Sequence, residues 1–209
     1  MPTTFRAIPQ IDPSDLSEGR RLHFYSKGEE IPLVPQGIWQ VQRGLVQFNT
    51  LHPNGEEVVL GWAESSAFFG LWFTSLQTYQ APALSEVYLS WFSLNEVENS
   101  SRLAQAMIPQ MRRRMRQTEA MLAIAGQRRV ENRLHQLLLL LKEEMGQPVD
   151  DGTRINARLT HQTIANAICT TRVTVTRLLS KLQSQGGIVL DSDRHIIVKN
   201  SSFANLTEW

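Results

Sequence analysis

The sequence predicts an α+β protein in three parts: an N-terminal antiparallel β-roll (a cupin-like jelly roll), a long dimerisation helix and a C-terminal winged helix-turn-helix. Three observations lead to this prediction. Short apolar runs separated by turn signals fill the first half, a heptad-like apolar repeat follows, and two short helices with a β-hairpin come last. We expect these parts, called the roll, the long helix and the reader, at residues 1–100, 101–126 and 127–209.

The roll is predicted from strand–turn units between residues 22 and 94. Apolar segments such as GIWQVQR and EEVVLGW alternate with turn signals at residues 27–29, 43–44 and 53–55. The strongest hairpin signal is Asn54-Gly55, because both residues tolerate positive φ. Short strands at this spacing are typical of an antiparallel roll or barrel.

An apolar repeat marks one face of the long helix. Its members recur in alternating steps of three and four, the spacing of an a/d seam. They are Ile108, Met111, Met115, Thr118, Leu122 and Ala125. This seam packs either on its own roll or against the same seam of a second subunit. We favour the homodimer, because the roll has its own core to fill and an exposed seam would be costly.

The reader begins after a break near Gly126. A second helix is expected over residues 128–145, with a deeply buried leucine run at residues 137–141, and Gly146-Gln-Pro148 ends it. Residues 150–158 are predicted to be a polar connection to the two short helices. The wing is expected at residues 188–198, with its tip at Asp191 to Arg194.

The last predicted helix, which starts at Arg172, has two contrasting faces. At 100° per residue, Val175, Leu178, Leu179 and Leu182 fall on one side. The opposite arc of about 140° holds Arg172, Val173, Thr176, Arg177 and Ser180. Guanidinium forks match guanine O6 and N7, and apolar groups match the thymine methyl. We therefore predict base contacts from Arg172 and Arg177, with Val173 and Thr176 as apolar or methyl contacts. The candidate phosphate contacts are Thr160, Thr171, Thr174 and Ser180.

The charge distribution agrees with a nucleic-acid partner. The chain has 209 residues, 21 Lys and Arg and 20 Asp and Glu, but residues 1–126 carry a net charge of −2. Residues 154–199 hold seven basic residues against Asp191 and Asp193. A basic region confined to the reader fits contact with DNA phosphates.

Composition excludes several other classes. A single cysteine, Cys169, rules out an internal disulfide, cysteine-rich zinc sites and four-cysteine iron–sulfur clusters. The roll holds only His23 and His52, too few for a clustered metal site, so we expect no metal and no cofactor. There is no Gly-rich phosphate loop or nucleophile–base pair, so we do not expect an enzyme. Without an 18-residue apolar run or a secretory signal, we expect a cytoplasmic protein with no membrane partner.

This order of parts, from residue 22 to 198, resembles the superfamily of bacterial transcription regulators that includes the cyclic-AMP receptor protein and FNR. The matching roll motifs are Lys27-Gly28-Glu29, Gly44-Leu45-Val46, Gly55-Glu56-Glu57 and Phe69-Gly70. The matching reader motifs are Leu159-Thr160, Ile164-Ala165, Thr171-Arg172 and Thr174-Val175-Thr176-Arg177. TRVTVTRLL and GQRRVENRLHQLLLLL look most like the cyanobacterial global nitrogen regulators, which implies a palindrome of the GTA…TAC type. Valine at position 173, where the cyclic-AMP receptor has an acid, implies a readout different from that protein's.

The resemblance also marks an effector pocket, for which Phe69, Gly70, Leu71, Trp72 and Arg128 are the candidates. Cyclic-nucleotide sensing in the superfamily uses a glutamate after the Phe-Gly and an arginine about a dozen residues later. Here Leu71 replaces the glutamate, and no arginine occurs between Arg43 and Arg102. A missing charge-assisted contact costs about 1.5–3 kcal/mol. We therefore expect no response to cyclic AMP, and a filled apolar pocket or an uncharged effector rather than a dicarboxylate.

Cys169 occupies the turn position at which the superfamily's two-helix motif usually has glycine. Glycine serves there because the backbone takes positive φ, so a cysteine should be strained by about 1 kcal/mol. A redox role would need a neighbour that stabilises the thiolate, and the sequence shows none.

Together these features predict a sequence-specific regulator that binds palindromic double-stranded DNA as a homodimer. RNA polymerase is a further expected partner of such a regulator. The alternative is a protein-interaction module that uses the roll, with DNA contact secondary.

Overall fold

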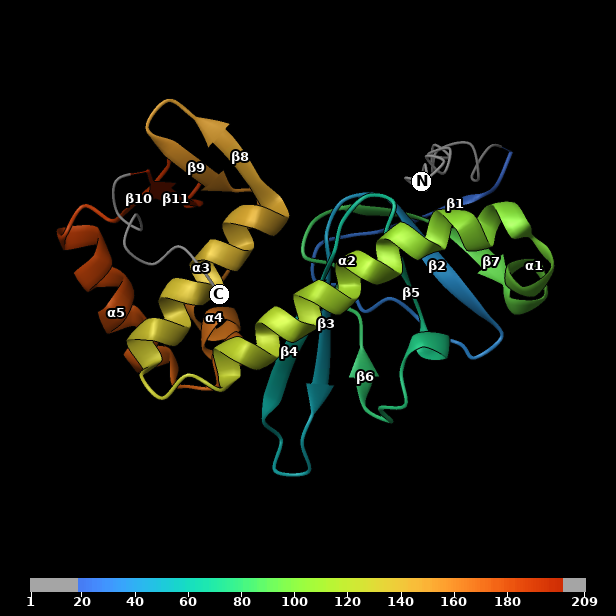
Figure 1. The fold of residues 1–209 in the computed structure, drawn as a ribbon, viewed down its shortest axis with the longest axis horizontal. Helices are drawn as coiled ribbons and strands as arrows, with labels where there is room; N and C mark the ends of the chain where they lie inside the picture. Colours follow the sequence, from blue (N-terminus) through green and yellow to red (C-terminus); the bar gives the residue numbers. More distant parts are fainter. Residues whose placement is uncertain (1–18, 201–209) are drawn as a thin grey trace, which may run out of the picture.

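The computed structural model describes residues 19–200, with the roll and the reader side by side and the long helix running between them (Figure 1). From residue 19 onward, the roll consists of seven strands and a short 3-10 turn, η2 (Leu71–Phe73). The strands are β1 (Leu22–Tyr25), β2 (Gly37–Arg43), β3 (Val46–Leu51), β4 (Glu57–Ala63), β5 (Phe68–Phe69), β6 (Tyr79–Gln80) and β7 (Val87–Ser93).

Two antiparallel sheets form the roll, with strand orders β1-β7-β2-β5 and β4-β3-β6. Phe48 and Phe69 are almost fully buried between them, with ring centroids 5.4 Å apart. The predicted hairpin turn lies between β3 and β4, where Gly55 has φ +83° and its N–H donates to the His52 carbonyl. The expected antiparallel roll is therefore confirmed.

Three helices follow the roll: α1 (Leu94–Asn99), α2 (Ser101–Ala125) and α3 (Val130–Met145). Ser93 and Glu96 form a capping box at the start of α1, and the Ser100 side chain caps α2. The long helix ends at Ala125, with Gly126 as its C-cap, so the expected break is confirmed. In α3, the side chains of Leu137, Leu138, Leu140 and Leu141 are buried, as the leucine run predicted.

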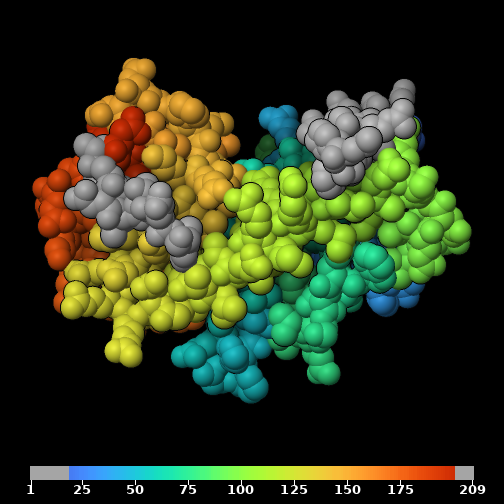
Figure 2. All heavy atoms as spheres, viewed as in Figure 1, coloured from blue at the N-terminus to red at the C-terminus, as the bar shows by residue number. Residues whose placement is uncertain are grey.

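The six seam residues of α2 are all exposed in the single chain, Met115 to 65% and Leu122 to 74%. The opposite face of α2 is buried instead, through Leu103, Ala106, Met107, Gln117, Met121 and Ile124. The interpretation in which the seam packs on its own roll is therefore wrong. Figure 2 shows α2 lying along one face of the molecule between the roll and the reader.

The remainder of the reader consists of four strands and two helices. They are β8 (Gly146–Val149), β9 (Gly152–Ile155), α4 (His161–Ala167), α5 (Arg172–Ser184), β10 (Ile188–Leu190) and β11 (Ile196–Lys199). The strands form one antiparallel sheet in the order β10-β11-β9-β8. The predicted polar connection at residues 150–158 is therefore partly wrong, because residues 152–155 form a strand. Gly152 allows this pairing, since a Cβ there would lie 2.3 Å from the Val198 carbonyl oxygen.

The reader packs directly against the roll. Leu45, Val59 and Trp62 of the roll share one buried cluster with residues of α3, α4 and α5, and α4 packs on β4. At the edge of this contact, Asn166 Nδ2 donates to Glu57 Oε2 at 2.7 Å. The pose of the two short helices therefore depends on a strand of the roll.

Candidate nucleic-acid interface

Helix α5 has the two faces that its sequence predicted. Val175, Leu178 and Leu179 are buried in the shared core. The five residues of the opposite arc, Arg172, Val173, Thr176, Arg177 and Ser180, are exposed, and Val173 is exposed to 78%. The helix thus presents a polar, basic surface with an apolar side chain near its start.

The threonines predicted to contact phosphate lie at the starts of the two short helices. Thr160 caps α4 by accepting from the Thr163 N–H at 3.0 Å, and Thr171 caps α5 by accepting from the Thr174 N–H at 3.2 Å. The Thr171 and Thr174 hydroxyls also bond each other at 2.9 Å. The exposed Thr160 and Thr171 hydroxyls therefore also stabilise the first turns of α4 and α5.

The turn between α4 and α5 has the predicted strain. Cys169 has φ +50°, in the left-handed region that favours glycine, and its side chain is exposed. The following Thr170 N–H donates to the Ala165 carbonyl at 3.0 Å and closes the turn. The expectation of positive φ at position 169 is confirmed.

The guanidinium groups of Arg172 and Arg177 are exposed and have no hydrogen-bond or ion-pair partner among residues 19–200. Some arginines elsewhere in the chain do find acceptors: Arg113 bonds Glu64 and Glu144, and Arg154 bonds Asp191. A guanidinium carries five donors and cannot accept, so the two α5 arginines are available for an external anion or acceptor.

The wing is stabilised by a contact that sequence reasoning missed. Arg154 of β9 donates from Nε to Asp191 Oδ2 at 2.6 Å and from Nη2 to His195 Nδ1 at 2.7 Å. The Arg154 hydrogen bond lowers the pKa of Asp191 to about 2. Asp191, Asp193 and His195 could together offer three metal-ligand atoms, but the Arg154 cation already bonds two of these residues. Arg194, with φ +63°, is exposed at the predicted tip.

A largely apolar hollow of about 430 Å³ lies between the roll and α2. Its roll wall consists of Phe48, Leu60, Phe68, Phe69, Phe73, Thr74, Leu76 and Tyr79. Its α2 wall consists of Gln110, Met111, Arg114, Met115, Thr118 and Glu119, and so includes three seam residues. Of the predicted effector residues, Phe69 lines the hollow, whereas Gly70, Leu71 and Trp72, which lie between the lining residues Phe69 and Phe73 in sequence, do not.

Arg128 is not part of this hollow. It is exposed in the break between α2 and α3, beyond the end of the helix that forms the wall, so its place in an effector pocket stays a prediction. The arginine that does lie there is Arg114, which sequence reasoning missed. Its guanidinium carbon lies 4.8 Å from the centre of the Phe48 ring. The hollow therefore contains a cationic side chain that comes from α2 and not from the segment after the Phe-Gly.

Arg114 is already bonded within the chain. Its Nη1 donates to the Leu60 carbonyl at 3.2 Å and to Gln117 Oε1 at 2.7 Å. Burial lowers the pKa of Arg114, and Tyr79 and Glu144 oppose that shift. The guanidinium still carries its charge at neutral pH.

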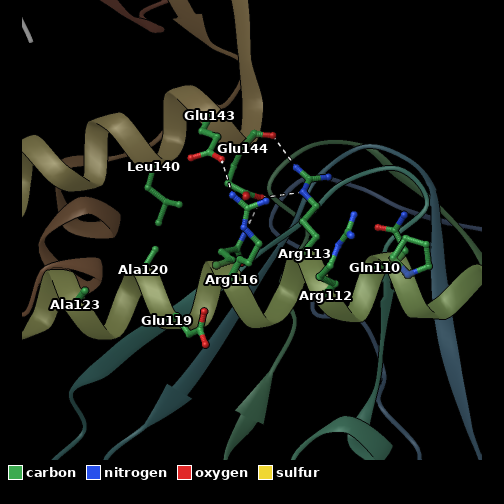
Figure 3. A pocket seen from close by; sticks show the side chains of 12 residues that line it. Gln110, Arg112, Arg113, Arg116, Glu119, Ala120, Ala123, Leu140, Glu143 and Glu144 are labelled. Carbon is green, nitrogen blue, oxygen red and sulfur yellow. Dashed lines mark hydrogen bonds and ion pairs between the residues drawn. The ribbon is translucent and has the colours of Figure 1, made fainter. Parts of the chain in front are cut away.

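Gln117 joins the roll to the reader. Its Oε1 accepts from the Trp62 N–H of β4 at 2.9 Å, and its Nε2 donates to Glu144 Oε2 of α3 at 2.9 Å. The side chain is buried, so each of these bonds is protected from water. Beside it, Arg113 and Arg116 extend from α2 towards Glu144 and Glu143 of α3 (Figure 3).

An antiparallel roll, a long helix with a bare apolar seam and a winged helix-turn-helix with unpaired arginines define a DNA-binding transcription regulator. Residues 132–202 match the Crp-like helix-turn-helix domain. A global nitrogen regulator of Synechocystis sp. is 33% identical over 174 residues, covering 78% of this chain and 76% of the relative. The regulatory protein CysR of Synechococcus elongatus is 35% identical over 173 residues, covering 80% of each chain.

Among solved structures, FixK2 from Bradyrhizobium japonicum superposes with a TM-score of 0.75 at 20% identity, covering 91% of this chain and 98% of that one. This likeness shows the shared fold. The chain belongs to the CRP/FNR family of transcription regulators, and its relatives are regulators rather than enzymes. Within residues 19–200, no helix has the length and apolarity needed to cross a membrane.

Proposed function

We propose that this regulator reads a palindromic DNA site as a homodimer, with α5 of each subunit in the major groove. The observation that carries the proposal is that Arg172 and Arg177 are exposed and that their guanidinium groups have no partner among residues 19–200. Each good bidentate contact to guanine contributes about 1–3 kcal/mol of discrimination. The likeness to the global nitrogen regulators supports a GTA…TAC site, and a cytoplasmic location goes with the proposal.

The test is a gel-shift titration with a GTA…TAC duplex and a scrambled duplex of the same composition. Arg172→Ala and Arg177→Ala should each weaken binding to the first duplex by about 5- to 150-fold per half-site and leave binding to the second nearly unchanged. Arg112→Ala is a matched control, because Arg112 is an exposed arginine on α2 and not on α4 or α5. Wild-type affinity for the GTA…TAC duplex in both reader variants would overturn the assignment of α5.

The homodimer is proposed from the bare seam of α2. Four of its large apolar side chains, Ile108, Met111, Met115 and Leu122, are between 49% and 74% exposed in the single chain. Such a stripe on a 25-residue helix needs a partner. In sedimentation, Met115→Glu and Leu122→Glu should give monomer, because each would bury two unpaired charges. An unchanged dimer in both variants would exclude this seam as the interface.

We also propose that cyclic AMP does not regulate the protein. Leu71 follows the Phe-Gly where the superfamily has a glutamate, and the Arg114 donor Nη1 is already bonded to Leu60 and Gln117. A phosphate that needs Nη1 would have to break those bonds. Calorimetry at millimolar cyclic AMP should show no saturable heat; a micromolar dissociation constant would contradict the proposal.

A protein-interaction module that uses the roll is the second candidate, and the exposed Trp72 and Leu76 on the roll favour it. The gel shift separates the two, since an interaction module would show no preference for the palindrome. For the first candidate, the DNA-binding regulator, we propose RNA polymerase as a further partner.

A further inference from the structure

His161 and Thr176 connect the two short helices of the reader at the surface that carries the arginines. His161 is the first residue of α4 and is half-buried; Thr176 lies in the exposed arc of α5. Their side chains meet with 2.7 Å between Nδ1 and Oγ1. The Thr176 hydroxyl also donates to the Arg172 carbonyl at 2.9 Å.

The protons in this arrangement can be assigned. A threonine hydroxyl has one proton, and the Arg172 carbonyl, which can only accept, takes it. With the hydroxyl proton assigned to that carbonyl, His161 donates the 2.7 Å contact in the tautomer that carries a proton on Nδ1. Within residues 19–200, the other ring nitrogen, Nε2, has no hydrogen-bond partner.

These two bonds fix the orientation of Thr176. A helical threonine otherwise divides between two χ1 rotamers, because its hydroxyl can bond a carbonyl of the preceding turn in either one. Here the carbonyl and the imidazole together hold the hydroxyl in one rotamer, which also fixes the direction of the γ-methyl. Because the hydroxyl proton is committed, the methyl is the group that remains for an apolar contact outside the chain.

We propose that His161 is a positioning residue for sequence readout: it holds the Thr176 hydroxyl so that the γ-methyl contacts a thymine methyl in each half-site. The inference rests on the proposed function, since it requires α5 to lie in the major groove. It names a base class, thymine, for the position that Thr176 faces. It also assigns a role in specificity to α4, whose sequence position gave no sign of it.

The experiment removes one methyl group from the DNA. Each thymine of a half-site, selected from a random duplex pool by the wild-type protein, is replaced in turn by deoxyuridine. At one position the wild-type protein should lose affinity about three- to fivefold, the effect of one buried methyl(ene) group at the ordinary transfer free energy. Thr176→Val keeps the methyl and should keep this sensitivity; Thr176→Ser lacks the methyl and should lose it.

His161 is tested in the same assay. His161→Ala frees the Thr176 rotamer and should reduce the deoxyuridine effect to less than twofold, whereas His161→Asn, whose amide N–H can replace Nδ1–H, should restore it. In a Thr176→Val background, His161→Ala should change nothing further, because valine has no hydroxyl to hold. A purely structural role for His161 would lower affinity equally for thymine and deoxyuridine duplexes.

The outcomes separate the two proposals. Wild-type protein that selects no site at all would overturn the proposed function. A specific site with no thymine whose sensitivity depends on Thr176, or an undiminished deoxyuridine effect in His161→Ala, would overturn this inference alone. Circular dichroism melts of each variant identify any that fail to fold, and the Thr176→Val and Thr176→Ser pair tests the methyl contact without altering His161.

Discussion

Arg114 on α2 and Arg177 on α5 carry the same guanidinium group in opposite surroundings. Arg114 is largely buried, bonds the Leu60 carbonyl and Gln117, and lies over the Phe48 ring. Arg177 is exposed, and no residue between 19 and 200 accepts a hydrogen bond from its guanidinium. A buried arginine that bonds acceptors inside the chain contributes to packing, whereas an exposed one that bonds none is available to bind an external partner.

The largest effect expected from this contrast is on stability. Arg114→Met should lower the free energy of unfolding by about 2–3 kcal/mol, because it leaves the buried Gln117 amide and Leu60 carbonyl short of a donor. Urea denaturation measures the change. Arg112→Met, on the exposed side of the same helix, is the control and should stay within about 0.5 kcal/mol of wild type. An equal decrease in the free energy of unfolding in the two variants would contradict the distinction between bonded and unbonded arginines.

A smaller effect of opposite sign is expected in the reader. Cys169→Gly should raise the free energy of unfolding by about 1 kcal/mol, since glycine adopts φ +50° without strain. The same urea experiment detects it as a higher midpoint with an unchanged slope. Cys169→Ala should give no such gain, because alanine keeps the Cβ. A gain in both variants would trace the effect to the thiol rather than to the backbone.

The reader arginines should scarcely affect stability. Arg172→Ala and Arg177→Ala each remove an exposed side chain without partners in the described chain, so the free energy of unfolding should change by less than about 0.5 kcal/mol. Thermal melts of the two variants, compared with Arg114→Met, give the direct test. A loss of 2 kcal/mol or more, roughly that of a buried hydrogen-bonded group, would show that these side chains bond within the protein after all.

The smallest effect concerns the wing in acid. Asp191 has a pKa of about 2 in the folded chain, below the usual 3.8, because Arg154 hydrogen-bonds its carboxylate. A depressed folded pKa gives a stabilisation that is complete above pH 3.8 and is lost as the pH falls towards 2. A carbon NMR titration of the Asp191 carboxyl should therefore show a midpoint near 2 in wild type. In Arg154→Met the midpoint should move up towards 3.8; an unmoved midpoint would show that another group holds the carboxylate.

The sequence predicted those parts of the molecule that depend on local periodicity. The two faces of α5 and the exposed seam of α2 follow from helical spacing. Arg114 and Arg128 could not be assigned in this way, because their positions depend on how α2 is rotated against the roll and where the chain turns at Gly126. The pairing of β9 with β11, and the contact of His161 with Thr176, join residues distant in sequence and likewise have no local signal.

The buried Gln117 amide has a consequence for the distance between two DNA half-sites. It ties the Trp62 backbone of the roll to Glu144 of α3, and the reader is further held where α4 packs on β4. In a twofold dimer, the separation of the two α5 helices would then be set by the roll of each subunit as well as by the seam. Residues 127–209 excised alone would retain the chemical groups that recognise a half-site. They would lose the contacts that set the spacing of the two readers to one helical turn of DNA.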